Sequence, residues 1–203
     1  MSTPPAGLRE RKKLETHRTL SATAVRLIGE YGLDQVTVDD IAAEAGVSTR
    51  TFFNYFASKE DSVLIPHADR EQRMTRMLER FAAQPPELGS LAALLAASRA
   101  DLVEIDRDPR EWLTRLRIVL DNPGLTLRAL ALDAETFAPL AAAVARRSGT
   151  DPAKDVFPTL VLSLLGGTIS ATLRLWSESD GTRPLVELFD EAAALATGLA
   201  GPA

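Results

Sequence analysis

The sequence contains no cysteine, which excludes disulfide bonds, thiolate metal sites and a cysteine nucleophile. Its two histidines, His17 and His67, stand far apart, and there is no HExxH pattern or paired histidine–carboxylate spacing. The adjacent glycines Gly166 and Gly167 are not part of a phosphate-binding loop. We therefore expect no catalytic residues, no metal and no cofactor. A helical enzyme without such motifs stays an alternative.

The sequence also lacks the alternation of polar and apolar residues that is typical of β-strands, and it has no internal repeat or low-complexity segment. Its start has no apolar stretch resembling a signal peptide, which favours a cytoplasmic protein. Hydrophobic residues make up 45% of the 203 residues, enough for a substantial core. The chain is thus expected to be a helical protein with a packed interior.

Acidic residues outnumber basic ones, which gives a formal net charge of −5, but the basic residues are unevenly distributed along the chain. Five cations lie between Arg9 and Arg18, against two anions. Residues 60–203 hold 15 Lys and Arg against 21 Asp and Glu. A nucleic-acid phosphate responds mainly to nearby cations, because salt screens charges beyond roughly 8 Å. The basic segment is compatible with nucleic-acid binding, although an ordinary solvated helix end would have a similar composition.

Helix boundaries are clearest in the first third of the chain. Apolar residues at helical spacing predict a first helix, which Gly32 ends because glycine readily adopts positive φ. Thr37 stands three residues before Asp40, the spacing of a capping box, and predicts a short helix that stops at Gly46. Ser48 is a suitable cap for a third helix to about residue 56.

Further helices are predicted along the rest of the chain. A second capping box at residues 58–61 predicts a long helix that reaches about residue 81. Other helices are predicted at 91–105, 112–120, 125–144, 152–176 and from 184 onward. Pro139 is expected to kink or divide the third of these. The predicted fold class is all-α.

The segment at residues 37–56 has the features of a helix-turn-helix. Two short helices that cross steeply need a small apolar contact, which Ala42 and Ala45 allow, and Gly46 permits the tight turn between them. The side chains expected to face outward from the second helix are Thr49, Arg50 and Asn54. They carry donors suited to base edges and phosphates, so this surface is a candidate for DNA contact.

From about Arg11 to Leu64 the chain resembles the DNA-binding domain of the TetR family of repressors. The residues that carry the resemblance are Gly32, Thr37, Val38, Ile41, Ala42, Gly46, Val47, Ser48, Phe56, Lys59 and Glu60. In that family the second helix of the motif enters the major groove. The resemblance implies phosphate contacts from Thr37, Ser48, Tyr55 and Lys59, base-facing positions at Thr49, Arg50 and Asn54, and either role for Thr51.

The aromatic residues of this segment include one departure from the family pattern. The family often has a tyrosine where this chain has Phe53, and the tyrosine hydroxyl binds phosphate. Phenylalanine has no hydroxyl, so that contact is lost or taken over by Tyr55. Phe52 and Phe56 are expected to pack in the core.

The resemblance also implies the architecture and activity of the whole chain. A DNA-binding domain is expected at residues 9–57, and a larger helical domain that binds an effector and dimerises is expected at 58–203. Regulators of this kind bind a palindromic double-stranded operator as homodimers, usually as repressors, and a small molecule releases them. The predicted long helix at 59–81 would couple the two domains.

Residues 156–173 contain no charge, and their number reaches the lower limit for a membrane-spanning helix. Pro158, the two glycines and several hydroxyl residues favour a helix in a subunit interface instead, with a membrane span as the alternative. The expected dimer interface consists of Leu160, Leu164, Gly167, Ala171, Leu175, Leu185, Phe189 and Ala192. Two such helices from each subunit would form a four-helix bundle.

The candidate wall of an effector pocket consists of Met77, Phe81, Arg99, Trp112, Leu116, Arg117, Leu120 and Phe137. Each apolar member is equally suited to ordinary core packing. Because binding pockets combine apolar walls with a few polar groups, we expect a small and partly apolar effector. A helical carrier of apolar ligands without a role on DNA is the alternative. That function would leave the outward-facing donors and the basic segment unexplained.

Overall fold

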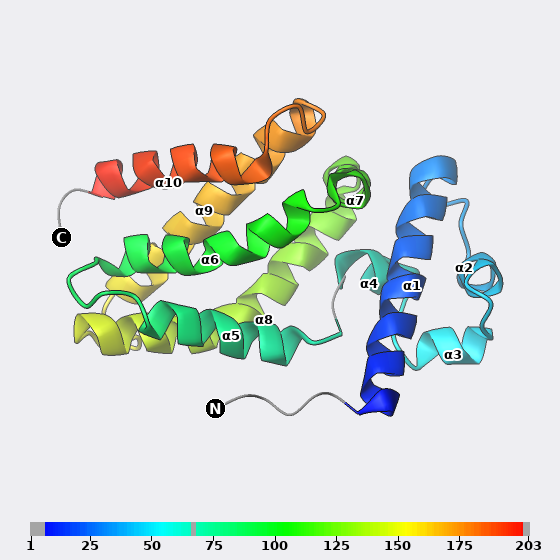
Figure 1. The fold of residues 1–203 in the computed structure, drawn as a ribbon, viewed down its shortest axis with the longest axis horizontal. Helices are drawn as coiled ribbons and strands as arrows, with labels where there is room; N and C mark the ends of the chain where they lie inside the picture. Colours follow the sequence, from blue (N-terminus) through cyan, green and yellow to red (C-terminus); the bar gives the residue numbers. More distant parts are fainter. Residues whose placement is uncertain (1–6, 66–67, 201–203) are drawn as a thin grey trace. The chain divides into compact units, whose positions relative to one another are not determined.

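The computed structural model describes residues 7–65 and 68–200, with the side chains of residues 130–137 and 200 outside the described set. Within these ranges every regular element is an α-helix, which confirms the expected all-α fold (Figure 1). The chain divides into two compact units. Unit 1 comprises the described residues up to Arg70 together with Thr114–Ala129, and unit 2 comprises Glu71–Leu113 and the described residues from Leu130 onward.

Unit 1 begins with α1 (Leu8–Tyr31), α2 (Val38–Glu44), α3 (Thr49–Phe53) and α4 (Lys59–Leu64). Gly32 ends α1 with a φ of 90°, and Thr37 forms the predicted capping box with Asp40 at the start of α2. The hydroxyls of Ser48 and Ser58 accept hydrogen bonds from backbone N–H groups in the first turns of α3 and α4. These local features confirm the predicted helix starts, although α3 ends at Phe53, earlier than expected.

The core of unit 1 is completed by residues from much later in the chain. Leu20, Ile41 and Phe52 are fully buried at the centre of the cluster that joins α1, α2 and α3. Ile118 and Leu125 belong to the same cluster and come from α7 (Pro109–Asp121) and α8 (Pro123–Ser148). Helices α7 and α8 therefore each contribute residues to both units.

A buried arginine attaches this later segment to α1 and α4. Arg115 is 4% exposed, and its guanidinium donates to the backbone carbonyls of Ser62 (3.5 Å) and Val63 and to the hydroxyl of Ser21 (3.1 Å). The Ser21 hydroxyl in turn donates to the Ser62 carbonyl at 2.7 Å. Because the last carbonyls of a helix have no partner within the helix, Arg115 supplies a donor to the carbonyl of Val63 and a second donor to that of Ser62.

Unit 2 contains α5 (Arg70–Ala82), α6 (Ser90–Asp106), α9 (Phe157–Glu178) and α10 (Leu185–Ala200), with the remaining parts of α7 and α8. Helices α9 and α10 pack on each other and on α6, and α6 lies between α5 and α10 (Figure 1). Asp106 at the end of α6 accepts hydrogen bonds from the N–H groups of Leu185 (2.8 Å) and Val186 (3.0 Å). A carboxylate distant in sequence thus caps the N-terminus of α10.

The structure corrects several predicted boundaries. The helix expected at 59–81 is two helices, because α4 ends at Leu64 and α5 begins at Arg70. Ile65 has φ −114° and ψ 75°, and it precedes Pro66, whose ring disfavours helical conformation in the residue before it. Helix α8 continues through Pro139 without division, and α9 begins at Phe157, later than expected. The expected domain boundary at residue 58 falls inside unit 1.

Candidate nucleic-acid interface

The turn between α2 and α3 holds the two helices in a helix-turn-helix arrangement. Gly46 has a φ of 69°, which favours glycine, and the N–H of Val47 donates to the carbonyl of Ala42 at 2.9 Å. Ile41 of α2 and Phe52 of α3 are both fully buried. Their burial fixes which side of α3 faces the core, so the opposite side of α3 is presented to solvent.

The three residues expected to face bases lie on the part of α3 that is not buried. Arg50 and Asn54 are exposed, and Arg50 has no hydrogen-bond partner among the described residues. Thr49 is half-buried, and its hydroxyl donates to the Oδ1 atom of Asp39 on α2 at 2.6 Å. Asp39 was not among the predicted site residues. Thr37 forms its capping box with Asp40, so the adjacent carboxylate of Asp39 has no part in that box. This second carboxylate was the feature of the sequence that could have pointed to Asp39 as a site residue.

The hydroxyls expected to bind phosphate already have partners within the motif. The Thr37 hydroxyl donates to Asp40 at 2.6 Å, and the Thr37 N–H donates to the same carboxylate at 2.9 Å. These hydrogen bonds hold the pKa of Asp40 below its ordinary value, so the capping box is intact at neutral pH. The hydroxyls of Ser48 and Thr51 lie 2.8 Å apart. Thr37 and Ser48 are exposed, so their oxygens remain accessible to a ligand.

Lys59, a phosphate contact implied by the resemblance, is already hydrogen-bonded within unit 1. Its ammonium group donates to the backbone carbonyls of Leu33 (2.6 Å) and Val36 (2.9 Å), in the loop between α1 and α2. A lysine ammonium has three donors, so two of them are used to hold this loop. The main role that the geometry gives Lys59 is therefore to fix the start of the helix-turn-helix.

The aromatic residues of this region divide into core and surface as expected. Phe52 and Phe56 are buried, whereas Phe53 is 54% exposed. Tyr55 is half-buried, and its ring lies 6.3 Å from that of His17 on α1. Burial, and secondarily the charge of Arg115, lowers the pKa of His17 to about 4, so His17 is neutral at physiological pH. His17 supports Tyr55 without adding charge.

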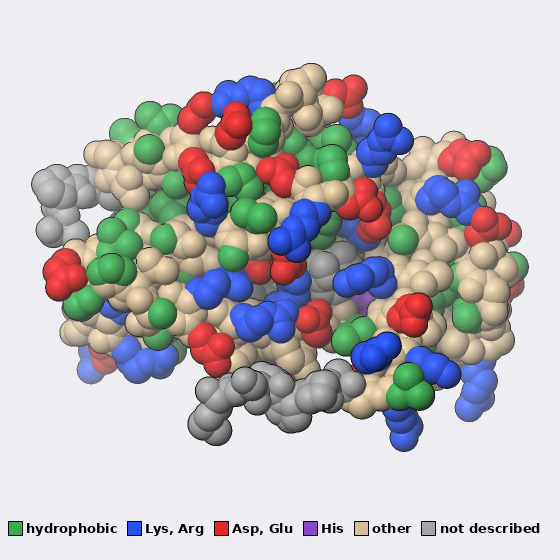
Figure 2. Space-filling view, in the orientation of Figure 1, with side chains coloured by type: hydrophobic (Ala, Val, Ile, Leu, Met, Phe, Trp, Pro, Cys, Tyr) green, Lys and Arg blue, Asp and Glu red, His purple; other side chains and the backbone are tan. Residues whose placement is uncertain are grey.

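Exposed cations accompany the motif along α1. Figure 2 shows Lys and Arg side chains gathered over the N-terminal end of α1 and beside α3, at the lower right of the view. The exposed cations of α3 and of the N-terminal half of α1 are Arg9, Arg11, Lys12, Lys13, Arg18 and Arg50. The basic segment noted in the sequence is thus attached to the same unit as the helix-turn-helix. The contact of His17 with Tyr55 and Phe56 places this part of α1 against the residues that directly follow α3.

Both parts of the chain match models of known protein families. Residues 20–63 match the model for bacterial regulatory proteins of the tetR family, and residues 88–200 match the model for the MftR C-terminal domain. The chain belongs to the TetR family of transcriptional regulators. The helix-turn-helix described above is the DNA-binding element of this family, which confirms the resemblance seen in the sequence.

Curated relatives match most of this TetR-family chain. TcmR of Streptomyces glaucescens, an HTH-type transcriptional regulator, is 31% identical over 182 residues, 86% of this chain and 79% of the relative. MftR of Mycobacterium tuberculosis, a putative mycofactocin biosynthesis transcriptional regulator, is 32% identical over 165 residues, 79% of this chain and 80% of the relative. Among solved structures, Bacillus subtilis FadR in complex with stearoyl-CoA has a TM-score of 0.58 at 24% identity, over 88% of this chain and 96% of FadR.

The expected dimer residues fall into two groups. On α9, Leu160 and Leu175 are 50% and 51% exposed, and Gly167 and Ala171 between them are also exposed. On α10, Leu185 and Phe189 are buried in the core of unit 2, so these two residues are not available to a partner. Ala192 is half-buried, as is Leu164. The interface prediction therefore needs correction at Leu185 and Phe189, which face α6 and α9 in the protomer's own core.

Beside the exposed α9 residues lies an open apolar groove of about 590 Å³. Its lining includes Leu91 of α6, Leu160 and Leu164 of α9, and Leu199 of α10. By length and composition α9 meets the criteria for a membrane span, with a mean hydropathy of 1.3, and a third of its most apolar window is buried. Length and composition alone do not establish a membrane span, because core helices of soluble proteins pass the same criteria.

The residues expected to line an effector pocket come from both units. Met77 and Phe81 are buried core residues of unit 2, where the Arg147 guanidinium lies 5.4 Å from the Phe81 ring centre. Trp112, half-buried, and Arg99 also belong to unit 2. Leu116, Arg117 and Leu120 belong to unit 1, and the side chain of Phe137 lies outside the described set. Arg99 forms a bidentate ion pair with Asp190 (2.8 and 2.9 Å) beside a small groove between α6 and α10.

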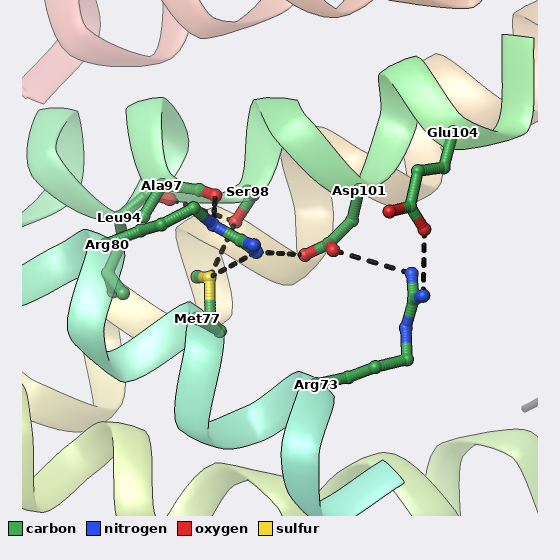
Figure 3. Close-up of polar contacts among 8 residues, drawn as sticks. All are labelled: Arg73, Met77, Arg80, Leu94, Ala97, Ser98, Asp101 and Glu104. Atoms are coloured by element: carbon green, nitrogen blue, oxygen red, sulfur yellow. Dashed lines mark hydrogen bonds and ion pairs between the residues drawn. The ribbon is translucent and has the colours of Figure 1, made fainter. Parts of the chain in front are cut away.

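The buried side of α5 is attached to α6 by a polar cluster, shown in Figure 3. Arg80 donates to Asp101 at 2.6 Å and to the carbonyl of Ala97 at 2.8 Å, and Arg73 donates to Glu104 at 2.8 Å. Arg73 also lies 3.4 Å from Asp101, so one carboxylate serves two arginines. With two cations facing two anions, the cluster is balanced in charge. These contacts hold α5 and α6 together, which is a structural role.

Proposed function

We propose that this TetR-family regulator binds a palindromic operator as a homodimer, represses transcription there, and is released by a small, partly apolar effector. The observation that carries the proposal is the exposed side of α3, where the side chains of Arg50 and Asn54 face solvent. Exposed cations on α1 extend the same surface with groups suited to phosphate. These features favour DNA recognition over a carrier function.

The dimer is supported by the α9 face that unit 2 leaves uncovered. Leu160, Leu164 and Leu175, with the small residues Gly167 and Ala171, form a stripe at helical spacing whose members lie at the surface or only half-buried. A second copy related by a twofold axis would cover this stripe with the identical stripe of its own α9. The same axis would relate two α3 helices, and a palindromic operator has the matching symmetry.

Selection of bound duplexes from a random DNA library tests the proposal. The wild-type protein should enrich a palindromic site, and Arg50→Ala should reduce discrimination at one base of each half-site by about 1–3 kcal/mol. Lys13→Ala, which removes a cation from α1, should weaken all duplexes alike and flatten the salt dependence by about one unit per subunit. Enrichment of no sequence, or a changed base preference in Lys13→Ala but not in Arg50→Ala, would contradict these roles.

The effector is proposed to act through unit 2, and helices α7 and α8 are the proposed coupling elements. The break between α4 and α5 removes the long helix that was expected to couple the domains. In contrast, α7 and α8 each run without interruption from residues of one unit to residues of the other. A ligand changes DNA affinity only if it binds two conformers unequally, and a rigid helix shared by both units transmits such a preference.

Calorimetry with and without operator DNA tests this coupling. Stearoyl-CoA is a suitable first probe, because it is partly apolar and is bound by the structural neighbour FadR. We expect ligand and operator to weaken each other's binding by the same factor, typically 5- to 150-fold for a coupling of about 1–3 kcal/mol. A probe that binds with equal affinity to the free protein and to the operator complex is excluded as the inducer.

A further inference from the structure

We infer that Asp39 makes Thr49 a hydrogen-bond acceptor toward DNA, so that Thr49 selects a base with an exocyclic amino group, adenine or cytosine. The inference rests on the proposed role of α3 in the major groove. It concerns one position in each half-site. It adds Asp39 to the interface as a positioning residue that acts through Thr49.

Thr49 and Asp39 are hydrogen-bonded to each other across the turn of the helix-turn-helix. Thr49 is the first residue of α3, and Asp39 is the second residue of α2. The Thr49 hydroxyl donates to Asp39 Oδ1 at 2.6 Å, a short bond typical of a hydroxyl facing a carboxylate. The neighbouring carboxylate of Asp40 is occupied by the Thr37 capping box and does not compete for Thr49. Asp39 is therefore the acceptor that fixes the direction of the Thr49 hydroxyl hydrogen.

The direction of this hydrogen determines what Thr49 can offer to a base. A hydroxyl has one hydrogen and two lone pairs, and an ionised carboxylate only accepts. With its hydrogen given to Asp39, Thr49 presents lone pairs alone. In the major groove adenine N6 and cytosine N4 are donors, whereas guanine O6 and thymine O4 are acceptors. Thr49 is thus paired with an amino group and repelled by a carbonyl oxygen.

A carboxylate near DNA has a second possible effect, which predicts a different result. If Asp39 acted only through its charge, it would repel phosphates on every duplex to the same extent. Its removal would then raise affinity for all sequences and leave the base preference unchanged. Positioning of Thr49 instead predicts a change of preference at one base. Base preference therefore separates the two effects.

The test compares duplex libraries bound by the wild-type protein and by Asp39→Asn, Thr49→Val, Thr49→Ser and the double variant Asp39→Asn/Thr49→Val. The position read by Thr49 is the one whose preference Thr49→Val abolishes. There the wild type should prefer amino-bearing over carbonyl-bearing bases by about 3- to 10-fold, the range expected for one hydrogen bond. Asp39→Asn should lose this preference, because an amide both donates and accepts. Thr49→Ser should retain it.

The double variant and a charge control complete the experiment. Asp39→Asn should have no further effect on the preference when Thr49 is already valine, as expected for two residues that act as one unit. Asp34→Asn, which removes a carboxylate from the exposed loop after α1, should leave the preference intact. Thermal melting of each variant checks that unit 1 is folded.

Three results would overturn the inference. They are an Asp39→Asn protein that keeps the wild-type preference, one that gains affinity for all duplexes alike, and one that binds no duplex although it is folded. A wild-type preference for guanine or thymine at the Thr49 position would also contradict it. If the wild-type protein selects no sequence, the proposed function fails. If the wild-type protein does select a sequence but Asp39→Asn gives one of the results above, only the Asp39 inference fails.

Discussion

Gly167→Asp is expected to separate the proposed dimer while leaving each protomer folded. Gly167 lies on the exposed stripe of α9, and a Cβ atom built there meets no other atom within 4 Å. The protomer therefore has space for the new side chain, and aspartate is no worse than glycine in a helix. In the dimer, two carboxylates would face each other at the centre of an apolar interface.

The expected loss is large because a buried charge without a partner costs about 3–5 kcal/mol. The dimer dissociation constant should rise at least about 100-fold, and sedimentation at micromolar concentration should show monomers. Operator affinity should fall in parallel, since each half-site alone offers half of the contacts. The control is Gly124→Asp, which adds the same charge at another exposed glycine with open space around it. A Gly167→Asp protein that remains dimeric would place the interface elsewhere.

Arg115→Met is expected to destabilise unit 1 by about 3–5 kcal/mol. Methionine preserves the length and flexibility of the side chain but provides no donors. The carbonyl of Val63 would lose the guanidinium that now binds it, as would the Ser21 hydroxyl. Bonds to a charged donor contribute about 1.5–3 kcal/mol each, and the groups left behind are buried. For a unit of this size the midpoint of thermal unfolding should fall by roughly 12 °C or more.

Arg18→Met is the matched control, since Arg18 is an exposed arginine of α1 in the same unit. It should change the free energy of unfolding by less than about 0.5 kcal/mol, as is typical of surface substitutions. Circular dichroism on both variants makes the comparison. Equal melting temperatures for Arg115→Met and the wild type would show that the buried guanidinium does not stabilise the attachment of the later segment to α1 and α4.

Features encoded over a few residues were predictable from the sequence. The capping box of Thr37, the cap at Ser48 and the turn at Gly46 each depend on neighbours within four residues, so the residue types alone indicate the structure. The exposed side of α3 follows from the same local information, because the positions of Phe52 and Phe56 determine which side is buried. The all-α fold and the family followed from these features.

Features that depend on distant partners were not predictable. Lys59 binds carbonyls 23 and 26 residues earlier, and nothing in its own neighbourhood distinguishes that contact from one with phosphate. Helix α10 has several apolar residues on more than one side, and only the packing of α6 and α9 decides that Phe189 faces inward.

The break after α4, in contrast, could have been predicted from Pro66, because the effect of a proline on the residue before it is local.

The division of unit 1 between two stretches of the chain also affects how the protein is made. Synthesis on the ribosome delivers α1 to α4 first, yet Arg115, Ile118 and Leu125 complete their core. The DNA-binding helices therefore have an unfinished interior until translation has passed residue 129, during which most of α5, α6 and α7 also emerges. A nascent chain that stalls before residue 129 would lack a complete unit 1. Only chains extended beyond that residue would be able to bind the operator.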